Sequence, residues 1–227
     1  MKKLLRSKPR SVRGEVGAIA PARWVVSAMS AVLVLSAGTI VGTNLVTAGP
    51  VADCAAGGPC VVGNTGPGGG TVFYVDMSRP VGSQYWEVGG DLGTADWGCF
   101  PVDIVGTGTA IGTGAANTSL INAGCGTAGI AARVASAPAG GYSDWFLPSL
   151  DELNQLCKYA RNQSTSAANQ AVVCDSTETL RAGFIGDWYW SSSQNTQYNA
   201  KAQDFLNGDA DFNGKGNAFP IRAVRAF

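Results

Sequence analysis

The placement of six cysteines constrains this chain more than any other feature. All of them follow a long uncharged segment, and none occurs before residue 54: Cys54, Cys60, Cys99, Cys125, Cys157 and Cys174. An even number on one side of an apolar segment is typical of disulfides in an exported domain, because such thiols are oxidised outside the cytoplasm. Of the many pairings possible, we predict the sequential one, in which each disulfide closes a short loop: Cys54 with Cys60, Cys99 with Cys125, and Cys157 with Cys174. No Cys-x-x-Cys pair is present, which argues against a zinc knuckle or a thioredoxin-type redox site.

The first 52 residues have the composition of a targeting segment. Residues 1–23 form a basic leader with seven Lys or Arg and one Glu, and residues 24–52 carry no charge. This order predicts a cytoplasmic N-terminus and translocation of the rest of the chain. The apolar run exceeds the length of about 20 residues that spans a bilayer, and it ends in small residues that a signal peptidase accepts. A cleaved signal peptide and an uncleaved membrane anchor both remain open, whereas Asp53 before Cys54 makes a poor lipoprotein signal.

The charge and the lack of histidine narrow the function. From Asp53 onward there are nine basic and fifteen acidic residues, a net charge of 9 − 15 = −6. An acidic domain lacks the basic face that nucleic acid requires, so we expect no nucleic-acid partner. The chain has no histidine, which removes the commonest general base and zinc ligand. The carboxylates of Asp151, Asp187 and Asp204 have no spacing that pairs them for glycoside hydrolysis, and we expect no enzyme.

The exported part has the pattern of an α+β domain. Residues 53–62 are predicted to be a linker with a small disulfide loop, and residues 63–227 the domain. Strands are predicted at 71–75, 84–90, 187–193, 200–208 and 218–227, and the glycine-rich stretch before residue 71 is predicted to be a tight turn. Helices are predicted near 129–136 and at 150–161, the second because Ser149 and Glu152 form a capping box before leucines at helical spacing. Strands on both sides of a helical middle favour α+β.

Several of these segments resemble a known family. The run GYSDWFLPSLDELNQL, then DWYWSSS, then Phe-x-x-Gly at 205–208 and the terminal IRAVRAF resemble the Lcl C-terminal domain family, and VGNTGPGGGTVFYVD is similar to the lead-in of its surface-protein members. The resemblance covers residues 62–227. It implies a C-type-lectin-like fold with small twisted antiparallel sheets, an extracellular position and a role in adhesion. The family takes its name from a bacterial collagen-like adhesin associated with sulfated polysaccharide, but the acidity of this domain argues against an anionic ligand.

We therefore expect a domain that binds an extracellular ligand, either a glycan or a surface protein. The expected surface lies in the C-terminal third, where amide and aromatic groups are dense: Trp190, Ser192, Gln194, Asn195, Tyr198, Asn199 and Asn207. One alternative is a structural envelope subunit without a ligand. Another is an enzyme related to the formylglycine-generating oxidases, whose reactive cysteine pair has no counterpart here. An exposed patch of aromatic and Asn side chains would favour the adhesin, and a featureless polar surface the structural subunit. The oligomeric state stays open.

Most of the aromatic residues in the segments that resemble the family are expected to lie in the hydrophobic core. We expect most of these large rings to pack the helix 150–161 against the sheet: Trp145, Phe146, Trp188, Tyr189 and Trp190. Because neighbours in a strand point to opposite faces, one of Trp188, Tyr189 and Trp190 is expected to be exposed to solvent.

Two further groups of side chains carry predictions. Arg222 and Arg225 are expected to pair with acidic residues of the domain. In DADFNG (209–214), the spacing of Asp209, Asp211 and Asn213 matches the start of a calcium loop. An EF-hand is excluded because its last ligand position holds Pro220, so a looser calcium site stays open, and a hairpin turn is favoured over it. No other cofactor is expected.

Overall fold

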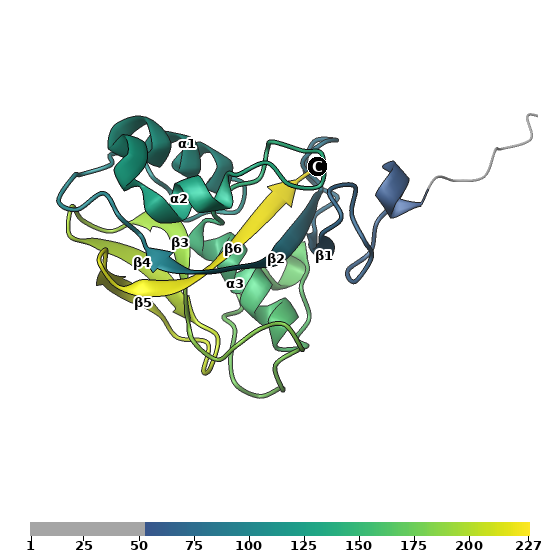
Figure 1. The fold of residues 1–227 in the computed structure, drawn as a ribbon. Helices are drawn as coiled ribbons and strands as arrows, with labels where there is room; N and C mark the ends of the chain where they lie inside the picture. Colours follow the sequence, from purple (N-terminus) through teal and green to yellow (C-terminus); the bar gives the residue numbers. More distant parts are fainter. Residues whose placement is uncertain (1–52) are drawn as a thin grey trace, which may run out of the picture. The chain divides into compact units, whose positions relative to one another are not determined.

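The structure is a computed structural model that describes residues 53–227 (Figure 1). The basic leader and the signal or anchor segment predicted within residues 1–52 lie outside the described residues. In the described part, three α-helices and two three-stranded antiparallel sheets form an α+β domain, as predicted. None of the helices in residues 53–227 has the length and apolar character needed to span a membrane.

The first sheet joins the two ends of the domain. It has the order β1 (Thr71–Val75), β2 (Tyr85–Asp96) and β6 (Ala218–Ala226), so the last strand pairs with the second. β1 has the predicted bounds, whereas β2 extends beyond the predicted 84–90 because β6 pairs along its length. Arg222 lies opposite Asp91 in this ladder, with nitrogen and oxygen 3.8 Å apart. The expectation that Arg222 pairs with an acidic residue of the domain is confirmed.

The second sheet is a meander of β3 (Trp188–Gln194), β4 (Asn199–Asp204) and β5 (Ala210–Gly214). The prediction that 209–214 forms a hairpin turn is wrong, because the residues from Ala210 to Gly214 all pair with β4. Pairing with a neighbouring strand outweighs the low strand propensity of Asp, Asn and Gly. The chain instead turns at 205–209, so β4 ends earlier than the predicted 200–208.

Three helices flank the sheets. α1 (Gly114–Cys125) and α2 (Ile130–Ala135) lie above β2 and β6 in the view of Figure 1, and α3 (Leu150–Ala160) lies below them. α3 begins at the predicted capping box, in which the Ser149 hydroxyl accepts from the Glu152 amide and the Glu152 carboxylate accepts from the Ser149 amide. The α2 prediction is confirmed. α1 was not predicted, because its sequence is rich in Gly, Ala, Ser and Asn. The side chain of its N-cap residue, Thr113, also makes no capping hydrogen bond.

Alternate side chains of β3 belong to two different cores. Tyr189 packs in the core beside α3, and Trp190 packs in the core beneath α1 and α2. Both rings are fully buried, as are Trp145 and Phe146 to within a few per cent. The expectation that most of these aromatic residues are core is confirmed. Trp188 alone is partly exposed, and its ring stacks on a neighbouring phenylalanine.

The three predicted disulfides are all present. The first closes a loop whose sulfur atoms pack on Val72, the second ties the loop 97–113 to the end of α1, and the third ties the segment 161–175 to α3: Cys54–Cys60, Cys99–Cys125 and Cys157–Cys174. Each restricts the unfolded chain and contributes about 2–4 kcal/mol of stability.

The glycine-rich turn wraps a buried carboxylate. Glu87 is fully buried, and its two oxygens accept from the amides of Gly68 and Gly70, both at 3.0 Å. A Cβ at Gly68 would lie 2.7 Å from the nearer Glu87 oxygen, so only glycine fits this close approach. The same carboxylate binds Arg225 at 2.9 Å, and Arg225 also binds Asp144 at 2.6 Å. The tight-turn prediction and the acidic partners expected for Arg225 are confirmed.

Candidate ligand-binding surface

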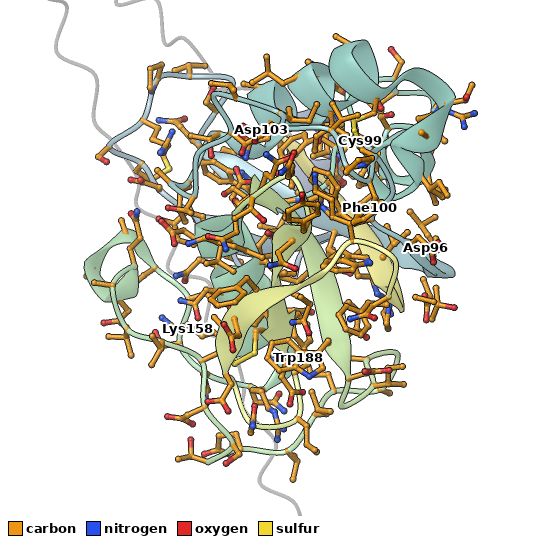
Figure 2. The ribbon with its side chains drawn as sticks, turned by 90° about the vertical axis from the view of Figure 1, so that its left-hand side faces the viewer. Asp96, Cys99, Phe100, Asp103, Lys158 and Trp188 are labelled. Carbon is orange, nitrogen blue, oxygen red and sulfur yellow. A yellow bond between two sulfur atoms is a disulfide. The ribbon has the colours of Figure 1, made fainter. Side chains whose placement is uncertain are left out.

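Two aromatic side chains from distant parts of the sequence meet at the surface. Phe100 is 65% exposed and Tyr198 is 51% exposed, and their ring centroids lie 5.6 Å apart at an angle of 46°. We call this pair the aromatic platform. Figure 2 shows the loop that carries Phe100 together with its neighbours Cys99 and Asp103. Two exposed rings in contact form a local apolar patch, and such patches can mark interaction surfaces.

The loop that carries Phe100 is held at several points. The disulfide at Cys99 ties it to α1, and the Cys99 amide donates to Ala128 at 2.7 Å. Further along, the Val102 carbonyl accepts from the Lys215 amino group at 2.8 Å. These contacts come from three different elements, so Phe100 is presented on a loop of fixed conformation.

The turn that carries Tyr198 is equally well fixed. Residues 195–198 connect β3 and β4, and the Thr196 hydroxyl accepts from the amides of Tyr198 at 3.1 Å and Asn199 at 3.2 Å. The Tyr198 carbonyl accepts from the Lys215 amide at 3.0 Å. These backbone contacts lower the ordering cost that a ligand contacting both rings would meet.

A chain of polar side chains links the loop that carries Phe100 to the end of β3 and to a buried lysine. The exposed Asp103 carboxylate accepts from the Gln194 amide nitrogen, and the Gln194 amide oxygen accepts from the Lys215 amino group at 2.6 Å. Lys215 is fully buried, with its nitrogen 4.5 Å from the centre of the Trp97 ring. Burial lowers the pKa of Lys215 to about 8, and the charge of Asp103 acts in the opposite direction. Lys215 therefore joins the loop 97–113 and the end of β3 through its amino group, and the turn 195–198 through its backbone amide.

The chemistry of this surface suits a molecule with one apolar face and several hydroxyl groups. The face of an aromatic ring is negative and attracts the C–H groups of a sugar ring. Asp103, on the loop of Phe100, and Asn195, on the turn of Tyr198, are exposed and offer hydrogen-bond acceptors and an amide donor. Within the described part of the chain, no group of three or more His, Cys, Asp or Glu side chains could hold a metal ion.

The structure brings some predicted ligand residues to this surface and removes others. Tyr198 is half of the platform, and Gln194, Asn195 and Asn199 flank it, although the Gln194 amide is occupied by the polar chain. Trp190 and Ser192 are fully buried.

Trp190 donates to the Ala95 carbonyl, and the Ser192 hydroxyl accepts from Asn117. Both are core residues in this structure and do not reach a ligand, because their strand is covered on both faces. Their assignment to the ligand surface is therefore corrected.

The remaining predicted residues lie in the β4–β5 turn and in β5, which runs back toward the platform end of the second sheet, where Asn213 pairs with Ala200. Asn207 and Asp209 occupy the β4–β5 turn and bind each other, with the Asn207 nitrogen 2.8 Å from Asp209. Asp211 and Asn213 follow in β5, where Asp211 accepts from the next amide. The structure does not gather these oxygens into one group, and their binding of calcium stays a prediction.

Sequence reasoning missed Phe100, Asp103 and Lys215. They lie in a glycine- and threonine-rich stretch and in a turn, where no periodic pattern marks them. The one available signal was the position of Phe100 directly after Cys99, since a disulfide fixes the backbone beside it.

These features define a disulfide-stapled α+β domain with a rigid, exposed aromatic pair. The family model of the Lcl C-terminal domain matches residues 110–225, just over half of the 227 residues. The chain belongs to the Lcl C-terminal domain family, and the resemblance seen in its sequence is confirmed. A search of curated proteins finds no match for this chain.

Proposed function

We propose that this chain is an exported bacterial surface protein whose C-type-lectin-like domain binds a neutral glycan at the aromatic platform. The observation that carries the proposal is the contact of two half-exposed rings, Phe100 and Tyr198, on loops of fixed conformation. A sugar ring stacked on either face would form hydrogen bonds with Asp103 and Asn195 at the rim. The basic leader and the family resemblance support export and the lectin-like fold.

Three features favour this proposal over its alternatives. The net charge of −6 from Asp53 onward and the carboxylate of Asp103 disfavour a sulfated polymer. An exposed patch that combines aromatic rings with Asn195 favours a ligand-binding protein over a structural envelope subunit. All six cysteines are in disulfides, which leaves no reduced pair for the chemistry of a formylglycine-generating oxidase.

A glycan array tests the proposal directly. The purified full-length protein is applied to neutral and sulfated glycans, with calcium and with a chelator. We expect binding to neutral glycans, and we expect a double variant, Phe100→Ala with Tyr198→Ala, to lose at least about tenfold in affinity. Stacking of a ring is worth roughly 1 kcal/mol beyond the area it buries, and two rings together account for such a loss.

A matched control separates the platform from aromatic residues in general. Phe212 in β5 is 56% exposed, similar to the two platform rings, and lies outside the platform. Phe212→Ala should bind glycans as the unmodified protein does, and both variants should keep its melting temperature within a few degrees. Glycan binding that survives the loss of both platform rings, or that needs Phe212, would move the site elsewhere. Failure to bind any glycan would favour the structural role.

A further inference from the structure

A groove lies between the first half of α3, the segment 167–173 and the strands β4 and β5. Its volume is about 420 Å³, which is within the range of small-molecule sites. Its walls are mainly aliphatic, and no aromatic ring lines it: Leu150, Ala167, Ala168, Ala171, Val173 and Ala210. None of these residues belongs to the aromatic platform, so the groove is a separate site that goes beyond the proposed function.

The outer wall of the groove is fastened to α3. The disulfide Cys157–Cys174 joins the segment to the helix covalently. The Asn154 side chain adds two hydrogen bonds, since its nitrogen donates to the Val172 carbonyl at 3.0 Å and its oxygen accepts from the Cys174 amide at 2.8 Å. The groove is therefore a preformed feature of the fold.

Two hydrogen-bond acceptors line the groove, and each lacks a donor or an ion-pair partner among residues 53–227. Gln203 is 1% exposed, and its nitrogen donates to the Gly208 carbonyl, but its buried amide oxygen has no hydrogen-bond partner among residues 53–227. Asp151 is half-buried and forms no ion pair with a described residue. Burial raises the pKa of the Asp151 carboxyl, and the charge of Lys201 only partly counteracts this. A buried acceptor without a donor is unfavourable, so both groups favour a ligand that supplies donors.

A ligand that satisfies these two acceptors would be a cation rather than a sugar. The Asn154 and Gln203 amide nitrogens each donate one hydrogen bond to a backbone carbonyl, whereas the Gln203 oxygen and the Asp151 carboxylate are acceptors to which no described residue supplies a donor. An ammonium group has three donors and no acceptor, and its positive charge is complementary to the Asp151 carboxylate, which the charge of Lys201 compensates only in part. The alanine-rich walls suit an unbranched hydrocarbon stem.

We propose that this groove binds a primary alkylammonium group, with the stem against the alanine walls and the ammonium at Asp151 and Gln203. The group can belong to a lysine side chain of a peptide or to a free polyamine, which share this chemistry. A single such group binds with a dissociation constant of about 1 mM, typical of so small a contact.

The experiment titrates small probes into the full-length protein and follows backbone and side-chain amide signals by NMR. The probes are Nα-acetyl-lysine methylamide, putrescine, and the neutral Nα-acetyl-norleucine methylamide. We expect both amines to shift the side-chain amide signal of Gln203, and norleucine to bind at least about tenfold more weakly than lysine. Tighter binding of the lysine amide indicates a peptide lysine as the natural ligand, and tighter binding of putrescine indicates a polyamine.

Two matched variants locate the binding. Asp151→Asn removes the charge and should weaken amine binding at least about tenfold, while Asp103→Asn removes a charge at the aromatic platform and should leave amine binding unchanged. Equal binding of lysine and norleucine would overturn the proposal without the need for any variant. Amine binding that depends on Asp103 instead of Asp151, or that leaves the Gln203 signal unmoved, would overturn it as well. Loss of glycan binding in the platform variants affects only the proposed function.

Discussion

Lys215 should make the domain more stable as the pH rises through a range where most proteins become less stable. Its amino group is fully buried, and the pKa falls from the ordinary 10.5 to about 8 because of burial. Between these values the unfolded chain carries a proton that the folded chain has lost, so the free energy of unfolding rises with pH. The difference, 10.5 − 8 = 2.5 pKa units, corresponds to about 3 kcal/mol. The cost of the buried charge is fully present below pH 8 and is relieved by about pH 10.5.

The measurement compares the full-length protein with Lys215→Met, which keeps the shape of the side chain and removes the charge. Urea unfolding is recorded at pH 7, 8, 9 and 10, and the variant's free energy of unfolding is subtracted from that of the unmodified protein. We expect this difference to rise by about 2–3 kcal/mol, or roughly 1–2 M in urea midpoint. The subtraction cancels groups such as Tyr74, whose pKa burial raises to about 12 and whose contribution has the opposite sign.

A control variant, Lys201→Met, removes one positive charge from a partly exposed position in β4. It should not reproduce the rise seen with Lys215→Met. A difference that stays flat or falls between pH 7 and pH 10 would refute the reasoning, because it would mean that the folded state holds the Lys215 proton at least as firmly as the unfolded chain does.

Three further predictions rest on the fold and on export. Glu87→Gln should lower the free energy of unfolding by about 3 kcal/mol, since it leaves Arg225 short of a buried partner, whereas Asp144→Asn at the exposed end should cost less than about 1 kcal/mol; equal costs would contradict the argument. Replacing Cys99 and Cys125 with serine should cost about 3 kcal/mol and weaken any glycan binding at the platform, measured on the same array; unchanged affinity would show that the disulfide does not hold the platform. External protease should remove the domain from intact cells while a cytoplasmic marker survives, and survival of the domain would contradict export.

The features that sequence reasoning predicted correctly are mostly local. The capping box at Ser149 and Glu152 involves residues three positions apart, and each disulfide closes a loop of at most 26 residues. Strands β1, β3 and β6 are rich in aromatic or β-branched residues and are flanked by turns, so their sequences alone indicate them. Helix α1 lacks both a cap and a regular apolar stripe, and packing on the sheet forms it instead.

Only one half of the candidate site was predicted, because its two halves come from parts of the chain that are far apart in the sequence. Tyr198 was found because polar loops rich in amide and aromatic groups are suited to binding, but its partner Phe100 lies far away in the sequence. The bond from Lys215 to Val102 likewise spans most of the domain. Trp190 was misassigned because alternation within a strand does not tell which faces of the sheet are covered.

The buried ion pair between Glu87 and Arg225 shows that the folded domain is larger than the segment that matches the family model. That segment, residues 110–225, contains Arg225 but not Glu87, and it lacks both strands that precede β6 in the first sheet. It also contains Cys125 without Cys99. A fragment cut at those limits would present β6 as an unprotected edge, a guanidinium without its main counter-ion and a reactive thiol, three conditions that promote aggregation and wrong disulfides. Expression trials on relatives should therefore begin upstream of the glycine-rich turn.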